Sequence, residues 1–150
     1  MSREVYIYAR NKKTKEEIML TWKGADTAQV ISECFDLNDQ EWTGTSDEFA
    51  RLIKKGLDAK VEKCVEELND LQESYDELKE LAVKAVNKEV SNDYYERLFD
   101  YKNDLKEAKD NVEWYAKVRD KLVYLSAQEF LQPEYGQKSC DWEMKVVYSY

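Results

Sequence analysis

Apolar residues recur at every third or fourth position through the middle of the chain. Between Leu57 and Ala85 the spacing alternates between four and three residues over four heptads: Leu57, Val61, Cys64, Leu68, Leu71, Tyr75, Leu78, Ala82 and Ala85. This spacing keeps one side of a helix apolar and is typical of a coiled coil. Thr45 and Glu48 have the spacing of a capping box, which predicts that this helix begins close to residue 46.

A second run with the same spacing follows: Tyr94, Leu98, Tyr101, Leu105, Ala108, Val112 and Tyr115. The register slips by two residues between the runs, so one continuous helix cannot carry both seams. We expect Asn87 to end the first helix and Ser91 to cap the second. A turn near residue 89 then produces a long, protruding antiparallel helical hairpin, in which Leu57 lies opposite residues 118–122.

The two ends of the chain show the alternation of apolar and polar residues that is typical of strands. Residues 5–9 and 18–22 alternate on either side of a basic turn and predict a β-hairpin. Residues 142–150 alternate in the same way and predict a third strand. Asp26 or Thr27 is positioned to cap a short helix that ends near Phe35, and residues 36–45 are interpreted as a loop.

These patterns together predict an α+β fold. Its expected parts are a small three-stranded antiparallel sheet, a short helix and the helical hairpin. We expect a single domain over residues 1–150, with a head formed by residues 1–45 and 130–150 and a hairpin arm formed by residues 46–129.

The net charge of −9 constrains the class of partner. An acidic surface is repelled by DNA and by anionic membranes, so we expect neither nucleic acid nor membrane to be bound directly, and a basic protein partner is favoured. The three cysteines form no CxxC pair, and we found neither a leader segment nor a long apolar run. These features predict a cytoplasmic protein with reduced thiols.

Catalytic and cofactor motifs are missing from the sequence. There is no histidine, and neither GxxxxGK[ST] nor GxGxxG occurs. Residues 36–47 partly follow the pattern of a calcium loop, but Glu41 replaces the required glycine and Asp47 the final glutamate. We therefore expect no catalytic residue, no metal and no cofactor; an enzyme that uses its abundant carboxylates is the least favoured class.

An acidic stripe follows the back of the first long helix. It consists of residues spaced by four and three: Glu66, Asp70, Glu73, Glu77 and Glu80. Residues 62–80 contain eight acids and two lysines, a net charge of −6, whereas residues 98–116 contain five acids and three lysines, a net charge of −2. The stripe is either a solvated face or a docking strip for a basic groove.

Two aromatic residues fall outside the apolar seam of the second long helix. Phe99 and Trp114 are expected to point outward and are candidates for a partner contact. The alternatives are contact with the short helix or with a second copy of the chain. The predicted partner-binding residues are thus the acidic stripe with Phe99 and Trp114.

In its size, acidity, abundance of Tyr and Asp and lack of an enzyme motif, the chain resembles accessory proteins that phages carry against host systems, including anti-CRISPR inhibitors. The resemblance is one of size and composition and assigns a role to no residue. It implies a non-enzymatic inhibitor or adaptor that docks on a basic, nucleic-acid-binding surface of a host protein. The alternative is a structural module that forms a homodimer through its coiled-coil hairpin.

Overall fold

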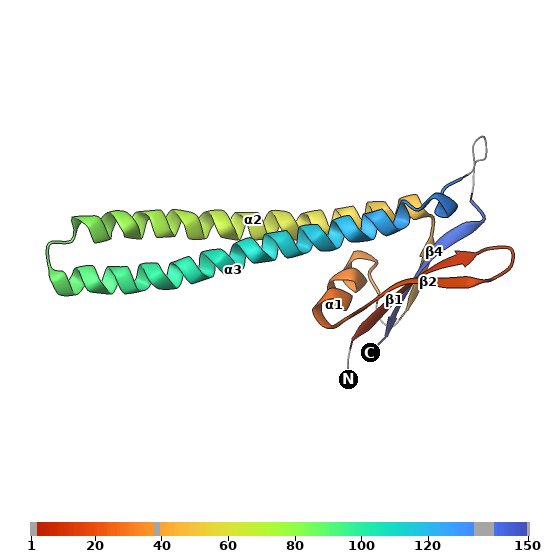
Figure 1. The fold of residues 1–150 in the computed structure, drawn as a ribbon, viewed down its shortest axis with the longest axis horizontal. Helices are drawn as coiled ribbons and strands as arrows, with labels where there is room; N and C mark the ends of the chain where they lie inside the picture. The colour runs from red at the N-terminus through yellow and green to blue at the C-terminus, as the bar shows by residue number, and fades with distance from the viewer. Residues whose placement is uncertain (1–2, 38–39, 134–139, 150) are drawn as a thin grey trace. The chain divides into compact units, whose positions relative to one another are not determined.

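The computed structural model describes residues 3–37, 40–133 and 140–149. Its elements, in chain order, are β1 (Glu4–Asn11), β2 (Glu17–Gly24), α1 (Ala25–Cys34), β3 (Glu41–Gly44), α2 (Ser46–Lys84), α3 (Lys88–Ser126), a short 3₁₀ turn (Glu129–Leu131) and β4 (Trp142–Ser149). Figure 1 shows these elements along the chain. They divide into one unit of residues 1–58 with 117–150 and a second unit of residues 59–116. The α+β class is confirmed.

The sheet is antiparallel and has four strands in the order β2-β1-β4-β3, so the prediction of three strands was wrong. The additional strand, β3, lies within the segment that was interpreted as a loop. Trp42 of β3 pairs with Val146 of β4. The centroid of the Trp42 indole lies 4.8 Å from the ring centroid of Phe35 and 6.3 Å from that of Phe49. Contacts with residues outside the strand therefore stabilise it, although it is too short to show an alternating pattern.

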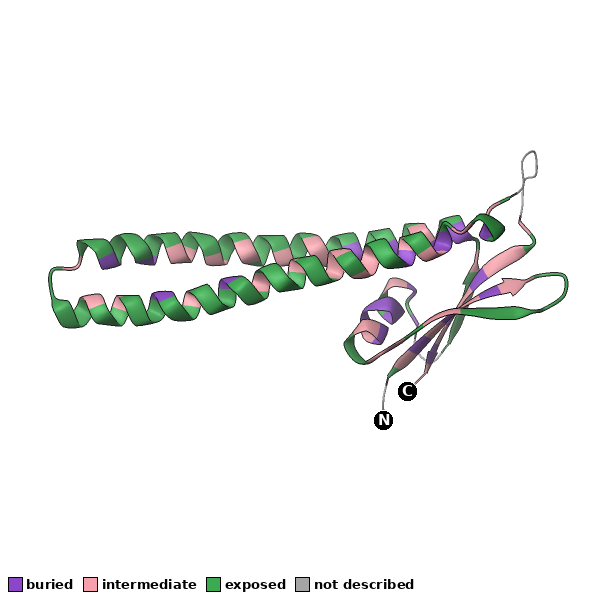
Figure 2. Cartoon of the chain, in the orientation of Figure 1, coloured by how far each residue is buried: buried purple, intermediate pink, exposed green. Residues whose placement is uncertain are grey.

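The buried face of the sheet follows the predicted alternation on β1 and β4. Val5, Ile7 and Ala9 of β1 are fully buried. On β4 the buried residues are Met144, Val146 and Tyr148. The same unit buries Ile31, Phe49, Ile53, Leu57, Leu122 and Leu131, and Figure 2 shows buried positions concentrated on these strands and on α1.

On β2 the alternation is interrupted by a bulge. Trp22 pairs with Tyr6 and Ile18 pairs with Ala9, but Leu20 has no partner in the register. The extra residue moves Trp22 and Ile18 to opposite faces of the sheet, although their spacing in sequence suggests one face.

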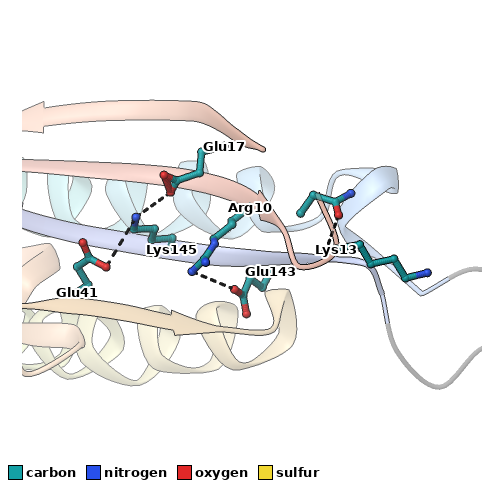
Figure 3. A network of polar contacts seen from close by, with 7 residues as sticks. Arg10, Lys13, Glu17, Glu41, Glu143 and Lys145 are labelled. Atoms are coloured by element: carbon teal, nitrogen blue, oxygen red, sulfur yellow. Dashed lines mark hydrogen bonds and ion pairs between the residues drawn. The ribbon is translucent and has the colours of Figure 1, made fainter. Parts of the chain in front are cut away.

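A network of ion pairs crosses the sheet and includes both edge strands (Figure 3). The Nζ atom of Lys145 on β4 lies 2.8 Å from a carboxylate oxygen of Glu17 on β2 and 3.7 Å from one of Glu41 on β3. The hydrogen bond to Glu17 is the main reason why the pKa of Lys145 is raised. Arg10 and Glu143 form a longer pair at 3.9 Å between β1 and β4.

The short helix α1 begins at Ala25 and has Gly24 as its N-cap, without a side-chain cap. Neither Asp26 nor Thr27 caps it, because both lie inside the first turn. At its other end, Cys34 closely approaches Gly56 of α2: a Cβ added to Gly56 would collide with the Cys34 Sγ and lie 3.2 Å from the Cys34 Cβ. Glycine inside α2 is thus explained by close packing.

The start of α2 confirms the predicted capping box. The Glu48 backbone N–H donates to the Thr45 hydroxyl over 3.1 Å, and the Thr45 backbone N–H donates to the Glu48 carboxylate over 3.3 Å. Each side chain therefore satisfies a backbone donor that the helix leaves without a partner.

The two long helices pack together as an antiparallel hairpin, as the register slip predicted (Figure 1). The cap assignment was wrong, however. The Asn87 carboxamide oxygen accepts the backbone N–H groups of Glu89 at 2.9 Å and Val90 at 3.3 Å, so Asn87 caps α3 and Ser91 lies inside its first turn. Further along, Arg119 donates to Asp58 over 2.9 Å, which agrees with the predicted alignment of residue 57 with residues 118–122.

Within residues 59–116 the core is the predicted seam. Leu78, Ala82 and Leu98 are buried together. Half-buried Tyr75, Tyr94 and Tyr101 pack around them. The tyrosines provide a large apolar area while their hydroxyl groups can remain near water.

The contact between Gly56 and Cys34 can be tested by adding a methyl group. Gly56→Ala should lower the free energy of unfolding by about 1–3 kcal/mol through overpacking, although alanine is the better helix former. The same change in a Cys34→Ala background should cost less, because the colliding Sγ is removed. Urea unfolding measures both, with Lys55→Ala at the exposed neighbouring position as the control. Equal stabilisation in both backgrounds would contradict this packing.

The seam can be tested with leucines in contrasting environments. Leu98→Ala, at a position that is 7% exposed, should cost about 2–5 kcal/mol of unfolding free energy, the usual range for a truncated core leucine. Leu81→Ala, at a position that is 51% exposed, should cost much less. Chemical denaturation of both variants measures the difference, and similar losses would refute the assigned seam.

Candidate functional site

The predicted acidic stripe lies entirely on α2, within residues 59–116. Glu66, Asp70, Glu73, Glu77 and Glu80 are all exposed. Leu78 and Ala82 of the same helix are buried in the seam. Spacings of four and three place the five carboxylates on one side of the helix, while the seam occupies another. The local fold is therefore sufficient to align them.

The carboxylates of the stripe have no partner among the residues that the structure describes. None of the five accepts a hydrogen bond or forms an ion pair within the described ranges. The sheet differs, since Lys145 engages Glu17 and Glu41 there. The negative charge of the stripe is thus left available to an external cation.

A shallow hollow on α2 gathers part of the stripe with neighbouring polar residues. Its lining consists of Asn69, Gln72, Glu73, Asp76, Glu77 and Glu80. Gln72 donates from its side-chain amide to Asp76 over 3.1 Å. The hollow therefore presents carboxylates and amides but no aromatic ring, a lining that attracts a compact positive charge. Within the described ranges, no three residues of the types that ligate metals are grouped closely enough to hold an ion.

The two candidate aromatic residues lie on α3. Phe99 is 64% exposed, and Trp114 is 36% exposed with its indole 4.9 Å from the ring of Tyr115 in an edge-to-face arrangement. Phe99 lines a second hollow, and all of the described residues that line it belong to α3. Three residues of the stripe thus line a hollow on α2, namely Glu73, Glu77 and Glu80, whereas Phe99 lines a separate hollow on α3. Trp114 lines neither of them.

The second hollow contains residues that were not singled out in the sequence. It is lined by Asn92, Tyr95, Glu96, Phe99 and Asp100. Tyr95 is 55% exposed and precedes Phe99 by four residues, which is one helical turn. The spacing of four between Tyr95 and Phe99 was present in the sequence. Tyr95 was not singled out because it follows Tyr94, which fits the spacing of the seam.

The surroundings of Cys64 do not activate its thiol. Cys64 is half-buried within the seam, and burial is the main cause that raises its pKa. A raised pKa leaves less of the nucleophilic thiolate at neutral pH. Cys64 therefore acts as a small packing residue.

No helix in the described part of the chain has the length and apolar character needed to cross a bilayer. The chain matches no protein-family model, and no curated protein or solved structure is significantly similar to it.

Proposed function

We propose that the protein is a non-enzymatic inhibitor or adaptor that docks through the acidic stripe of α2 on a basic, nucleic-acid-binding surface of a host protein. The observation that carries the proposal is a row of five exposed carboxylates on one side of α2, none of which has a partner among the residues that the structure describes. Its size and composition resemble those of phage proteins directed against host systems, and we propose the same role for this chain.

The spacing of the charges favours occlusion of a basic groove over imitation of a duplex. Glu66 and Glu80, the two ends of the stripe, are 14 positions apart, which corresponds to about 21 Å of helix. That gives about one carboxylate per 5 Å, against about one phosphate charge per 1.7 Å of duplex DNA. The stripe needs only to cover cationic side chains that would otherwise contact nucleic acid.

The like charges also carry a cost that a partner would remove. Glu66 with Asp70 and Glu73 with Glu77 are spaced by four residues, and each such pair destabilises a helix by about 0.2–0.5 kcal/mol. A cationic partner would replace this repulsion with attraction. Long-range attraction would also accelerate encounter at low salt.

The proposal is tested by neutralising the stripe. A variant in which Glu66, Asp70, Glu73 and Glu77 are replaced by Gln retains the seam and should have equal or slightly higher thermal stability. Association with a partner captured from bacterial lysate should slow and should lose most of its dependence on salt. Stopped-flow association rates across a salt series provide the measurement.

A control with the same charge change is available on α3. Its positions are all exposed: Asp104, Glu107, Asp110 and Glu113. Neutralising them alters the net charge as much as neutralising the stripe but should affect association far less. An oligonucleotide should also compete with the native protein for the captured partner. Equal rates for the stripe variant and the native protein at low salt would refute the proposal.

A second candidate function is a structural module that dimerises through the hairpin. It is favoured by exposed apolar side chains near the turn between α2 and α3: Leu81, Val83, Val86 and Val90, which are 51%, 73%, 101% and 44% exposed. Single exposed apolar side chains are normal on a protein surface, whereas several of them close together are typical of an interaction site. Four such side chains near one turn therefore favour an interface.

Light scattering distinguishes this candidate from the first. If the hairpin dimerises, the molar mass should rise with protein concentration, and Leu81→Ser with Val83→Ser should abolish the rise. A monomer at all concentrations would exclude the structural module and leave the inhibitor or adaptor as the remaining proposal.

A further inference from the structure

The hollow on α3 combines two kinds of side chain in adjacent rows. Tyr95 and Phe99 form an aromatic row, and Glu96 and Asp100 form an acidic row one residue further along. Residues four apart lie on the same side of a helix, and the two rows are separated by about 100° around the axis. Asn92 completes the lining.

The groups in this hollow are exposed and available. Tyr95 and Phe99 are 55% and 64% exposed. Within the described ranges, neither Glu96 nor Asp100 forms an ion pair. Arg97 is the nearest cation in sequence, but it does not line the hollow. The lining therefore carries two negative charges and no positive charge.

We propose that this hollow binds an arginine side chain of the partner protein. A guanidinium is planar, stacks on an aromatic ring and can donate two parallel hydrogen bonds to a carboxylate. Tyr95 and Phe99 supply the ring faces, and Glu96 and Asp100 supply the acceptors beside them. The complementary charge selects a cation, and the rings select one with a flat, weakly hydrated surface.

The comparison with α2 supports this assignment. The hollow on α2 contains carboxylates and amides without an aromatic ring, so it offers a guanidinium hydrogen-bond acceptors but no ring on which to stack. The α3 hollow differs because Tyr95 and Phe99 provide two rings on which a guanidinium can stack. The inference rests on the proposed function, because it supplies one contact with the same basic partner, but its residues lie outside the stripe.

The test uses a short peptide of alternating glycine and arginine, titrated into the full chain at low salt and followed by NMR. Saturable shifts of the backbone amides of residues 92–100 are expected. The lysine version should bind more weakly, by up to about fivefold, because an ammonium can approach a ring but has no flat face to stack on it. The citrulline version has the same shape without the charge and should not saturate.

Substitutions locate the contact. Phe99→Ala should weaken binding of the arginine peptide by about two- to fivefold and reduce its preference over lysine, since Tyr95 and the two carboxylates remain. Tyr124→Ala removes another exposed ring from α3 and should leave binding unchanged. Glu96→Gln with Asp100→Asn should weaken binding more than Asp110→Asn with Glu113→Gln, which changes the net charge equally. Circular dichroism verifies that each variant is folded.

Equal affinity for the arginine and lysine peptides, together with no effect of Phe99→Ala, would overturn the inference and indicate diffuse attraction to an acidic surface. The outcome is separable from that of the proposed function. If the stripe is needed for partner association but the peptide ignores Phe99, this inference alone fails. If the peptide binds at Phe99 but association does not depend on the stripe, the proposed function alone fails.

Discussion

The packing of α2 against α3 along one apolar seam determines what the rest of the hairpin can present. Leu78, Ala82 and Leu98 lie buried between the helices, with tyrosines around them. The seam occupies only one side of each helix, so the other sides are exposed to solvent over most of residues 59–116 (Figure 2). The stripe and the α3 hollow both exist because the seam fixes which side of each helix remains exposed.

Charge is used differently in the two units. Across the sheet, Lys145 satisfies carboxylates from both edge strands, so its charges contribute to local structure. Along α2 the carboxylates of the stripe are exposed and unpaired within the described residues. Exposed ion pairs contribute little to stability, so their absence is tolerated there. The carboxylates of the stripe are not used in ion pairs within the described residues, so they are available to bind a cationic partner. This contrast with the sheet supports a binding role for residues 59–116.

Several elements were predictable because their signals are local. The alternation of three and four identified both long helices, and Thr45 with Glu48 identified the start of α2 correctly. β3 was missed because its stability comes from Trp42, whose contacts with Val146, Phe35 and Phe49 no short window of sequence contains. Asn87 and Ser91 are both good caps, and only the folded turn determines that Asn87 is used.

The candidate site was predicted in part for similar reasons. The stripe is a single-helix feature and is exposed as expected, whereas its role as a binding surface stays a prediction. The pairing of Phe99 with Tyr95 in one hollow was missed, although a spacing of four was present. Glycine is a poor helix former, and the sequence alone gives no reason for Gly56 inside α2. The reason is the Cys34 side chain, which leaves no room for a Cβ there. The fold decides which residues become neighbours, whether they are distant in sequence, as Cys34 and Gly56 are, or close, as Tyr95 and Phe99 are.

Carboxylate footprinting measures directly whether the stripe on α2 faces the partner. The protein is treated with a water-soluble carbodiimide and an amine, alone and with the captured partner, and each modified carboxylate is quantified by mass spectrometry. This placement of the stripe predicts strong protection at Glu66, Asp70, Glu73, Glu77 and Glu80, with Asp104, Glu107, Asp110 and Glu113 on α3 modified equally in both states. Protection of the α3 set with an unprotected stripe would contradict it.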